Sequence, residues 1–142
     1  MKATQPSLEN IDTFNNIPFY SQSVAAGFPS PADDFLEFDL SLDKKLIKHP
    51  SATFFVRVSG TSMINAKIFD GSILLVDKAE KIKNDDIVLA VIDGCFTVKR
   101  YRKVGDSVFL YPENKLLRPI KIVEGSESYI WGKVMWSFNR IG

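Results

Sequence analysis

Two short segments of the chain hold the residues best suited to covalent chemistry. Residues 59–63 read SGTSM, a turn of small residues that exposes the hydroxyl of Ser62, and residues 96–100 read FTVKR, with Lys99 among apolar neighbours. A serine hydroxyl becomes a nucleophile at neutral pH only beside a base, and a lysine can be that base once it has lost its proton. Taken alone, such segments are more often a polar turn and an ordinary strand lysine.

To act as a catalytic pair, Ser62 would need an oxyanion hole beside it, and Lys99 would need a lowered pKa. A glycine-containing turn can leave the backbone N–H groups of Thr61 and Ser62 unpaired, and two such groups beside a serine hydroxyl make an oxyanion hole. Strand alternation puts Thr97, Lys99 and Tyr101 on one face. A free lysine has a pKa of about 10.4 and a useful base about 7–8, so Lys99 would have to be buried to lower its pKa by about three units.

Other catalytic or metal-binding groupings are weaker. A Ser-His-Asp triad, or a Cys-His dyad with Cys95, would depend on His49, which precedes Pro50 and is better explained as a turn residue. One cysteine and one histidine also make a Cys/His zinc site implausible. Asp85 and Asp86 are typical of a solvated turn, and no phosphate-binding glycine motif occurs. The sequence therefore predicts no cofactor and no metal.

Length and composition indicate a chain with one core. The 142 residues are 45% hydrophobic and 25% charged, with 18 Lys and Arg against 17 Asp and Glu. We expect no strong direct nucleic-acid binding, because phosphate binding usually shows as basic excess, although residues 99–103 (KRYRK) are a local basic run. The apolar runs 73–76 and 87–92 are far shorter than the roughly 20 residues that cross a bilayer, and no secretory signal is present. With the single Cys95, this predicts a cytoplasmic protein without a membrane partner.

The elements that must position these residues are mostly strands. Residues 1–31 are polar or proline-containing, and we expect an extended arm outside the core. A helical turn or two is expected near residues 43–48 and ends at Pro50. Farther on, β-branched and aromatic runs alternate with Gly and Asp turns, and Asp93-Gly94 predicts a tight hairpin. The expected strands are 53–58, 72–76, 87–92, 95–101, 108–111, 119–123 and 129–138, so the fold class is mainly β.

The order of several motifs resembles the peptidase domain of the LexA/UmuD family, the S24 self-cleaving serine peptidases. The motifs that carry this resemblance are 59–63, 70–71, 97–100, 112–114 and 119–120. Residues 28–34 (FPSPADD) and 49–56 (HPSATFFV) resemble the UmuD branch, whose members serve SOS mutagenesis after DNA damage. The resemblance covers roughly residues 24–136, and several ordered motifs are far more specific than any one of them.

This resemblance implies a fold, a reaction and partners. The fold is a β-rich LexA/signal-peptidase-like domain that acts as a homodimer. Ser62 is the nucleophile and Lys99 the general base, and the cleaved bond joins Ala26 to Gly27. Residues 1–26 would be a flexible arm removed by self-cleavage, and residues 27–142 the peptidase and dimerisation domain. A RecA filament on single-stranded DNA would stimulate cleavage, and the trimmed dimer would serve translesion synthesis with UmuC as the accessory subunit of DNA polymerase V.

The sequence departs from the family pattern in places, and two alternative functions remain. The 26 residues before the cut leave no room for the helix-turn-helix domain of LexA-type repressors, which favours UmuD-type function. Asp70-Gly71-Ser72 replaces the commoner Asp-Gly-Asp and alters one turn. Leader peptidases share the dyad but need a membrane anchor, which this sequence does not predict. A non-catalytic β-rich dimeric interaction module and an SOS transcriptional regulator remain as alternatives, and the effect of Ser62→Ala on cleavage separates the first of them.

Overall fold

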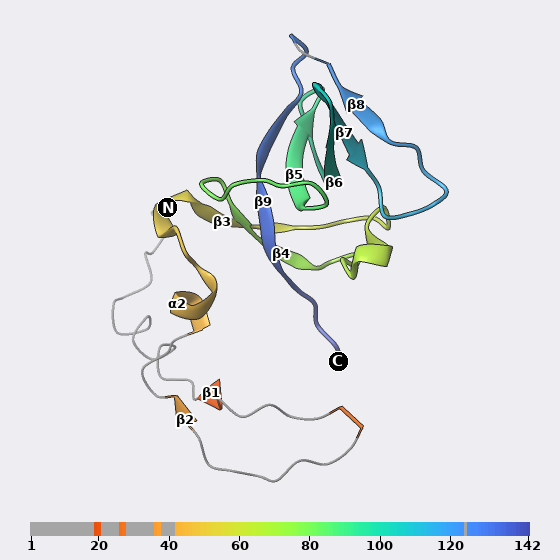
Figure 1. Ribbon diagram of the computed structural model, residues 1–142. Helices are drawn as coiled ribbons and strands as arrows, with labels where there is room; N and C mark the ends of the chain where they lie inside the picture. The colour runs from red at the N-terminus through yellow and green to blue at the C-terminus, as the bar shows by residue number, and fades with distance from the viewer. Residues whose placement is uncertain (1–18, 21–25, 28–35, 38–41, 124) are drawn as a thin grey trace, which may run out of the picture. The chain divides into compact units, whose positions relative to one another are not determined.

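The computed structural model describes residues 19–20, 26–27, 36–37, 42–123 and 125–142 and divides the chain into two units, residues 1–48 and 49–142 (Figure 1). In the first unit, β1 (Phe19–Tyr20) and β2 (Leu36–Glu37) pair antiparallel, and the short helix α2 (Leu42–Leu46) follows. The helix agrees with the turn expected near residues 43–48. The sequence predicted no strand where β1 lies, and most of the expected arm falls outside the described residues.

The second unit is built on one seven-stranded antiparallel sheet with the order β3-β4-β9-β5-β6-β7-β8. Each of the seven strands expected after residue 52 is present, with bounds that shift by at most three residues, and the mainly β fold class is confirmed. Two 3-10 turns, η1 (Pro50–Ala52) and η2 (Ile64–Ala66), lie in the connections. The strands are β3 (Thr53–Arg57), β4 (Ile73–Asp77), β5 (Ile87–Ile92), β6 (Cys95–Val104), β7 (Ser107–Tyr111), β8 (Ile120–Ile122) and β9 (Tyr129–Phe138).

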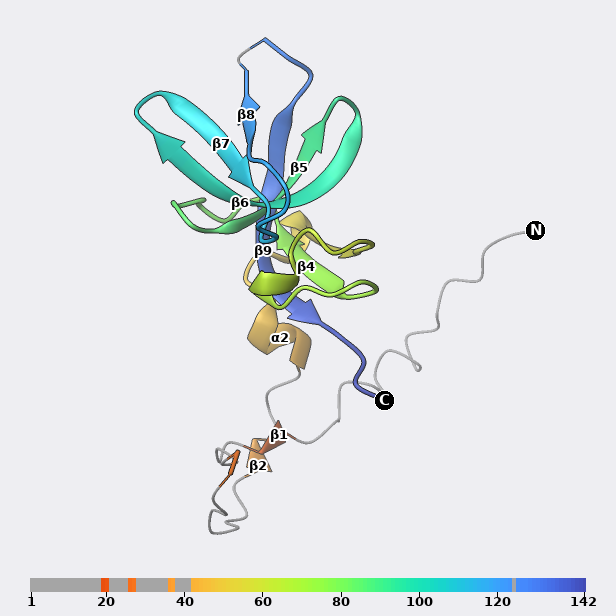
Figure 2. The same cartoon turned by 90° about the vertical axis from the view of Figure 1, so that its right-hand side faces the viewer.

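The long strand β9 joins the two halves of this sheet (Figures 1 and 2). Its residues 129–133 pair with β5, and its residues 133–138 pair with β4. Gly132 lies where β9 passes from one partner to the other, and a Cβ there would meet Val76 Cγ1 at 2.7 Å and the Asp77 carbonyl oxygen at 3.1 Å. Only glycine allows the backbones to approach so closely.

Two clusters of buried side chains form the core, one on each face of β5. Leu89 packs with Met63, Ile68, Leu74 and Val76, whereas the neighbouring Val88 and Ala90 pack with Leu110. Because side chains alternate along a strand, β5 is buried on both faces, as its unbroken apolar run predicts. In the part of the chain that the structure describes, no helix combines the length and the apolar character needed to cross a membrane.

Candidate active site

The turn that carries Ser62 is held on both sides. Met63, the next residue, is 2% exposed and belongs to the first core cluster. Gly60 has a φ of +98°, a conformation that favours glycine, and its N–H donates to Asp70 Oδ1 at 2.9 Å. A buried anchor after Ser62 and a side-chain hydrogen bond before it therefore fix the position of the hydroxyl.

The neighbouring turn at residues 70–72 is tied to the same strand end. The Gly71 N–H donates to the Val58 carbonyl at 2.7 Å, and the Val58 N–H donates to the Ser72 carbonyl at 2.8 Å. Ser72 is buried, and its Oγ accepts the Phe69 N–H at 3.0 Å. The serine that departs from the commoner Asp-Gly-Asp pattern thus closes this turn with its own hydroxyl.

Lys99 lies in the middle of β6, opposite the buried Val88 of β5. The two strands are joined by Asp93 and Gly94, both with positive φ, which makes the tight hairpin that the sequence predicted. Lys99 is only 8% exposed, and its Nζ donates a hydrogen bond to Ser62 Oγ at 3.1 Å. Burial lowers the pKa of Lys99 below the ordinary lysine value of 10.5, because the charged form loses water. The structure thus brings together the two residues chosen from the sequence.

The backbone beside Ser62 offers hydrogen-bond donors. Among the described residues, the N–H groups of Thr61 and Ser62 have no acceptor, while the Thr61 carbonyl accepts the N–H of Ile64 at 3.3 Å. Both N–H groups are therefore available to donate hydrogen bonds to a ligand oxygen. Their use as an oxyanion hole stays a prediction.

A groove of about 300 Å³ lies next to Ser62. Its walls come from the end of β3 with the following residues, from Leu89 of β5 and from the beginning of β6. The lining residues on the β3 side are Val56, Arg57, Val58 and Ser59, and those on the β6 side are Phe96, Thr97 and Val98. The groove can accept a short segment of extended chain beside the hydroxyl.

Ala26 and Gly27, where cleavage is expected, form an exposed bend in the first unit. Gly27 has a φ of +123°, a conformation that L-residues with a side chain rarely adopt. The bond between these residues therefore lies in an accessible stretch of small residues. That it is the cleaved bond stays a prediction.

The weaker groupings do not assemble around Ser62. His49 Nδ1 lies 2.7 Å from Asp77 Oδ2 rather than beside the serine, and Cys95 is exposed at the start of β6. Burial alone would raise the pKa of Asp77, but hydrogen bonds from His49 and from two backbone N–H groups lower it below its ordinary value. His49 is therefore part of a side-chain cluster and more than the turn residue that the sequence suggested.

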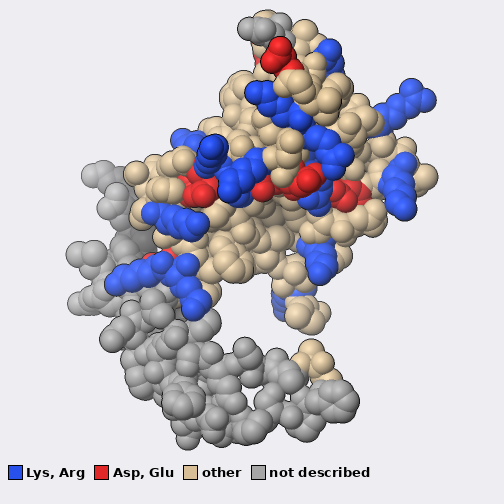
Figure 3. All heavy atoms as spheres, viewed as in Figure 1, with Lys and Arg blue, Asp and Glu red and all other residues tan. Residues whose placement is uncertain are grey.

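Two of the four basic residues in the run 99–103 pair with acidic side chains. Lys99 is buried against Ser62, Arg100 pairs with Glu113, and Arg102 Nη2 lies 2.7 Å from Asp85 Oδ1. Figure 3 shows acidic and basic side chains interspersed on the face in view. Asp85 is consequently an ion-pair residue, which its place in a polar connection did not reveal.

A mainly β domain that places a serine turn against a buried lysine has the arrangement of serine peptidases with a Ser/Lys pair. The chain belongs to the S24-like peptidase family, since its residues 18–135 match the family described as Peptidase S24-like. The expected membership of the S24 peptidases of the LexA/UmuD type is confirmed.

Three relatives show how far the similarity extends. Protein MucA of Salmonella typhimurium is 43% identical over 124 residues, which cover 87% of this chain and 84% of MucA. Protein ImpA of the same species is 47% identical over 108 residues, covering 68% of this chain and 74% of ImpA. LexA repressor 2 of Geobacter sulfurreducens is 41% identical over 119 residues, covering 83% of this chain but 58% of the repressor.

Proposed function

We propose that this protein is a self-cleaving serine peptidase in which Ser62 is the nucleophile and Lys99 the general base. The observation that carries the proposal is the 3.1 Å contact between Lys99 Nζ and Ser62 Oγ, made by a lysine that is almost fully buried. Burial favours the neutral amine, which is the form that can accept a proton. Membership of a peptidase family supports the same reading.

The reaction follows from these two groups. Neutral Lys99 accepts the Ser62 proton as Oγ bonds to the carbonyl carbon of Ala26, and the N–H groups of Thr61 and Ser62 stabilise the resulting oxyanion. The Ala26–Gly27 bond then breaks, and the proton passes from Lys99 to the Gly27 amine. Water, deprotonated by Lys99, hydrolyses the serine ester, which releases residues 1–26 and regenerates Ser62.

The groove beside Ser62 is the binding place that we assign to the segment around Ala26. Small residues suit this position, because the cleaved bond must lie close to a serine held in a tight turn and to a buried lysine. The segment can come from the same chain or from a second copy.

The biological setting that we propose is the SOS response in the cytoplasm. A RecA filament on single-stranded DNA would bind the form of the protein in which the cleavage segment is docked, and so raise the cleavage rate by shifting the population toward it. The trimmed homodimer of residues 27–142 would then act with UmuC in error-prone translesion synthesis. Similarity to proteins of the LexA and MucA types supports this setting.

Intact mass spectrometry of the purified protein tests the reaction. After incubation at pH 7 and at about pH 10, wild type should lose residues 1–26, faster at the higher pH, while Ser62→Ala and Lys99→Ala stay whole. Cys95→Ser is the matched control and should be cleaved like wild type, because Cys95 is exposed and outside the proposed mechanism.

Two results would contradict the proposal. A wild type that stays intact at both pH values, even with RecA, nucleotide and single-stranded DNA, would favour the non-catalytic interaction module. A cut that persists in both Ser62→Ala and Lys99→Ala would show that another protease acts on the arm.

A further inference from the structure

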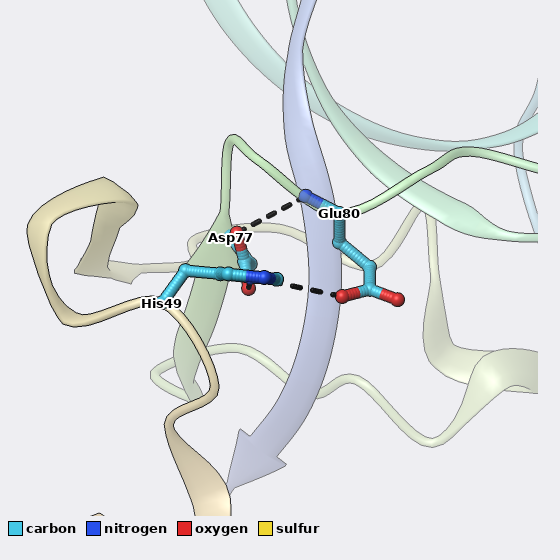
Figure 4. A group of neighbouring side chains, drawn as sticks. All are labelled: His49, Asp77 and Glu80. Atoms are coloured by element: carbon cyan, nitrogen blue, oxygen red, sulfur yellow. Dashed lines mark hydrogen bonds and ion pairs between the residues drawn. The ribbon is translucent and has the colours of Figure 1, made fainter.

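Three side chains with metal-binding atoms meet near the end of β4 (Figure 4). They are His49 at the start of the second unit, Asp77 at the end of β4, and Glu80 in the connection after β4. The ligand atoms, one from each side chain, all lie within 4.8 Å of one another. This cluster plays no part in the proposed cleavage reaction.

The Asp77 carboxylate is buried and already oriented. Its Oδ1 accepts the backbone N–H groups of Ala79 at 2.8 Å and Glu80 at 3.2 Å. Its Oδ2 is then directed at His49 Nδ1, 2.7 Å away, and Glu80 Oε2 lies 3.8 Å from the same nitrogen. Asp77 Oδ2 and Glu80 Oε2 thus both lie near His49 Nδ1.

The backbone around His49 is fixed by the β3–β4 pair. The Thr53 hydroxyl donates to the His49 carbonyl at 2.6 Å, and the Lys78 N–H donates to the Ala52 carbonyl at 2.9 Å. The Asp77 side chain is 2% exposed, whereas that of His49 is 43% exposed and that of Glu80 23%. The cluster therefore has a rigid, buried floor and a side open to solvent through which an ion could enter.

We propose that His49, Asp77 and Glu80 bind one divalent transition-metal ion of the Zn²⁺ type. One imidazole nitrogen with two carboxylates is a donor set that zinc uses, with water as the fourth ligand, whereas Ca²⁺ and Mg²⁺ prefer oxygen ligands alone. Zinc–ligand bonds of about 2.0–2.2 Å place tetrahedral ligand atoms roughly 3.3 Å apart. The separations of 2.7 and 3.8 Å from His49 Nδ1 lie on either side of that value, and all three ligand atoms lie within 4.8 Å of one another. Small side-chain rotations are therefore enough to form the site.

Binding replaces the hydrogen bond between His49 and Asp77. The Nδ1 lone pair coordinates the ion, so a neutral ring carries its proton on Nε2, and a charged ring releases one proton. The metal then links the first residues of the second unit to β4. An ion that binds the folded chain alone raises its apparent stability by mass action.

Isothermal titration of the metal-free, full-length chain with Zn²⁺ at pH 7 tests this site. Wild type should bind one ion per chain, and its melting temperature should rise with Zn²⁺ concentration. Glu80→Gln should bind at least about tenfold more weakly, because even the loss of an outer-shell partner costs 10–100-fold in affinity. This variant keeps the backbone N–H that Asp77 accepts, so it should remain folded.

Two controls separate the cluster from other zinc ligands. Glu127→Gln makes the same chemical change at an exposed position and should bind like wild type, and Cys95→Ser removes the exposed thiol and should also bind like wild type. The proposal is overturned if wild type shows no saturable binding up to millimolar Zn²⁺, or if Glu80→Gln binds as tightly as Glu127→Gln. Loss of binding in Cys95→Ser would likewise overturn it, since the thiol would then hold the ion. The outcome does not depend on whether Ser62 cleaves the chain.

Discussion

At the residue scale, Lys99 shows both what the sequence could predict and what it could not. Alternation in a strand and resemblance to the peptidase family were enough to pair Lys99 with Ser62. Burial could be stated only as a requirement, because it depends on β5, on the turn at 59–63 and on the core beneath them. The same limit applies to His49, whose partners Asp77 and Glu80 lie far along the chain and carry no shared motif.

Burial of Lys99 should make stability depend on pH. The pKa of Lys99 is lowered in the folded chain, so between that value and the unfolded value of 10.5 the unfolded chain binds more protons. The contribution of Lys99 to the free energy of unfolding therefore rises with pH between its folded-state pKa and 10.5. In a Ser62→Ala background, Lys99→Met should be more stable relative to its parent at pH 7 than at pH 10, as measured by urea unfolding.

Lys103→Met in the same background is the control, because Lys103 is exposed on the same strand. Its stability relative to the parent should not follow the pH trend of Lys99→Met. Equal pH trends for the two variants would mean that Lys99 is not desolvated in solution.

At the element scale, the turns matter more than the strands for the site. The strand segments were readable from β-branched and aromatic runs, and the Asp93-Gly94 hairpin from its two turn residues. The hydrogen bond from the Gly60 N–H to the Asp70 carboxylate was not readable, because it joins two turns that are brought together by the β3–β4 pair. Asp70 is therefore a positioning residue that the sequence revealed only as part of a turn.

Asp70→Ala should slow self-cleavage more than it lowers stability. The Gly60 N–H is exposed and can bond to water instead, so the free energy of unfolding should fall by only about 1 kcal/mol. Because the turn that carries Ser62 loses its hydrogen bond to Asp70, the cleavage rate should fall several-fold. Mass spectrometry measures the cleavage rate, and urea unfolding measures the stability of the same variant. Asp106→Ala, at an exposed turn away from Ser62, should leave the rate unchanged. If the cleavage rate falls equally in Asp70→Ala and Asp106→Ala, the hydrogen bond between Gly60 and Asp70 does not position Ser62.

Gly132→Ala should test the passage of β9 from β5 to β4. The added Cβ would lie 2.7 Å from Val76 Cγ1 and 3.1 Å from the Asp77 carbonyl oxygen, both in the packed core region. We expect a loss of about 1–3 kcal/mol in the free energy of unfolding, as for other overpacked sites. Gly142→Ala, which meets nothing within 4 Å, should change stability by less than about 0.5 kcal/mol. If Gly132→Ala and Gly142→Ala have the same free energy of unfolding in urea, β9 and β4 can move apart at Gly132 without loss of stability.

At the scale of the whole molecule, the sequence predicted the fold class and the strands but not the sheet order. Strand β9 pairs with β4 and β5, whose paired residues precede it by 38 to 65 positions, and no local signal selects those partners. Composition predicted the net charge, but not where the charged side chains lie or which of them form ion pairs. The net charge of +1 hides ion pairs such as Arg102 with Asp85, which engages one residue of the basic run 99–103.

The position of the buried clusters gives a last prediction, about the fragment that the proposed cleavage would leave. Among the residues that the structure describes, both buried clusters and the side chains packed against them lie between residues 54 and 134, inside the second unit. Removal of residues 1–26 should therefore leave the free energy of unfolding of the fragment 27–142 within about 1 kcal/mol of the Ser62→Ala full-length chain, since burial of apolar surface dominates stability. Urea unfolding followed by the fluorescence of Trp131 and Trp136 measures both transitions on side chains of β9. A fragment that unfolds with several kcal/mol less free energy, or without a cooperative transition, would show that the first 26 residues pack on the sheet and that cleavage exposes a surface.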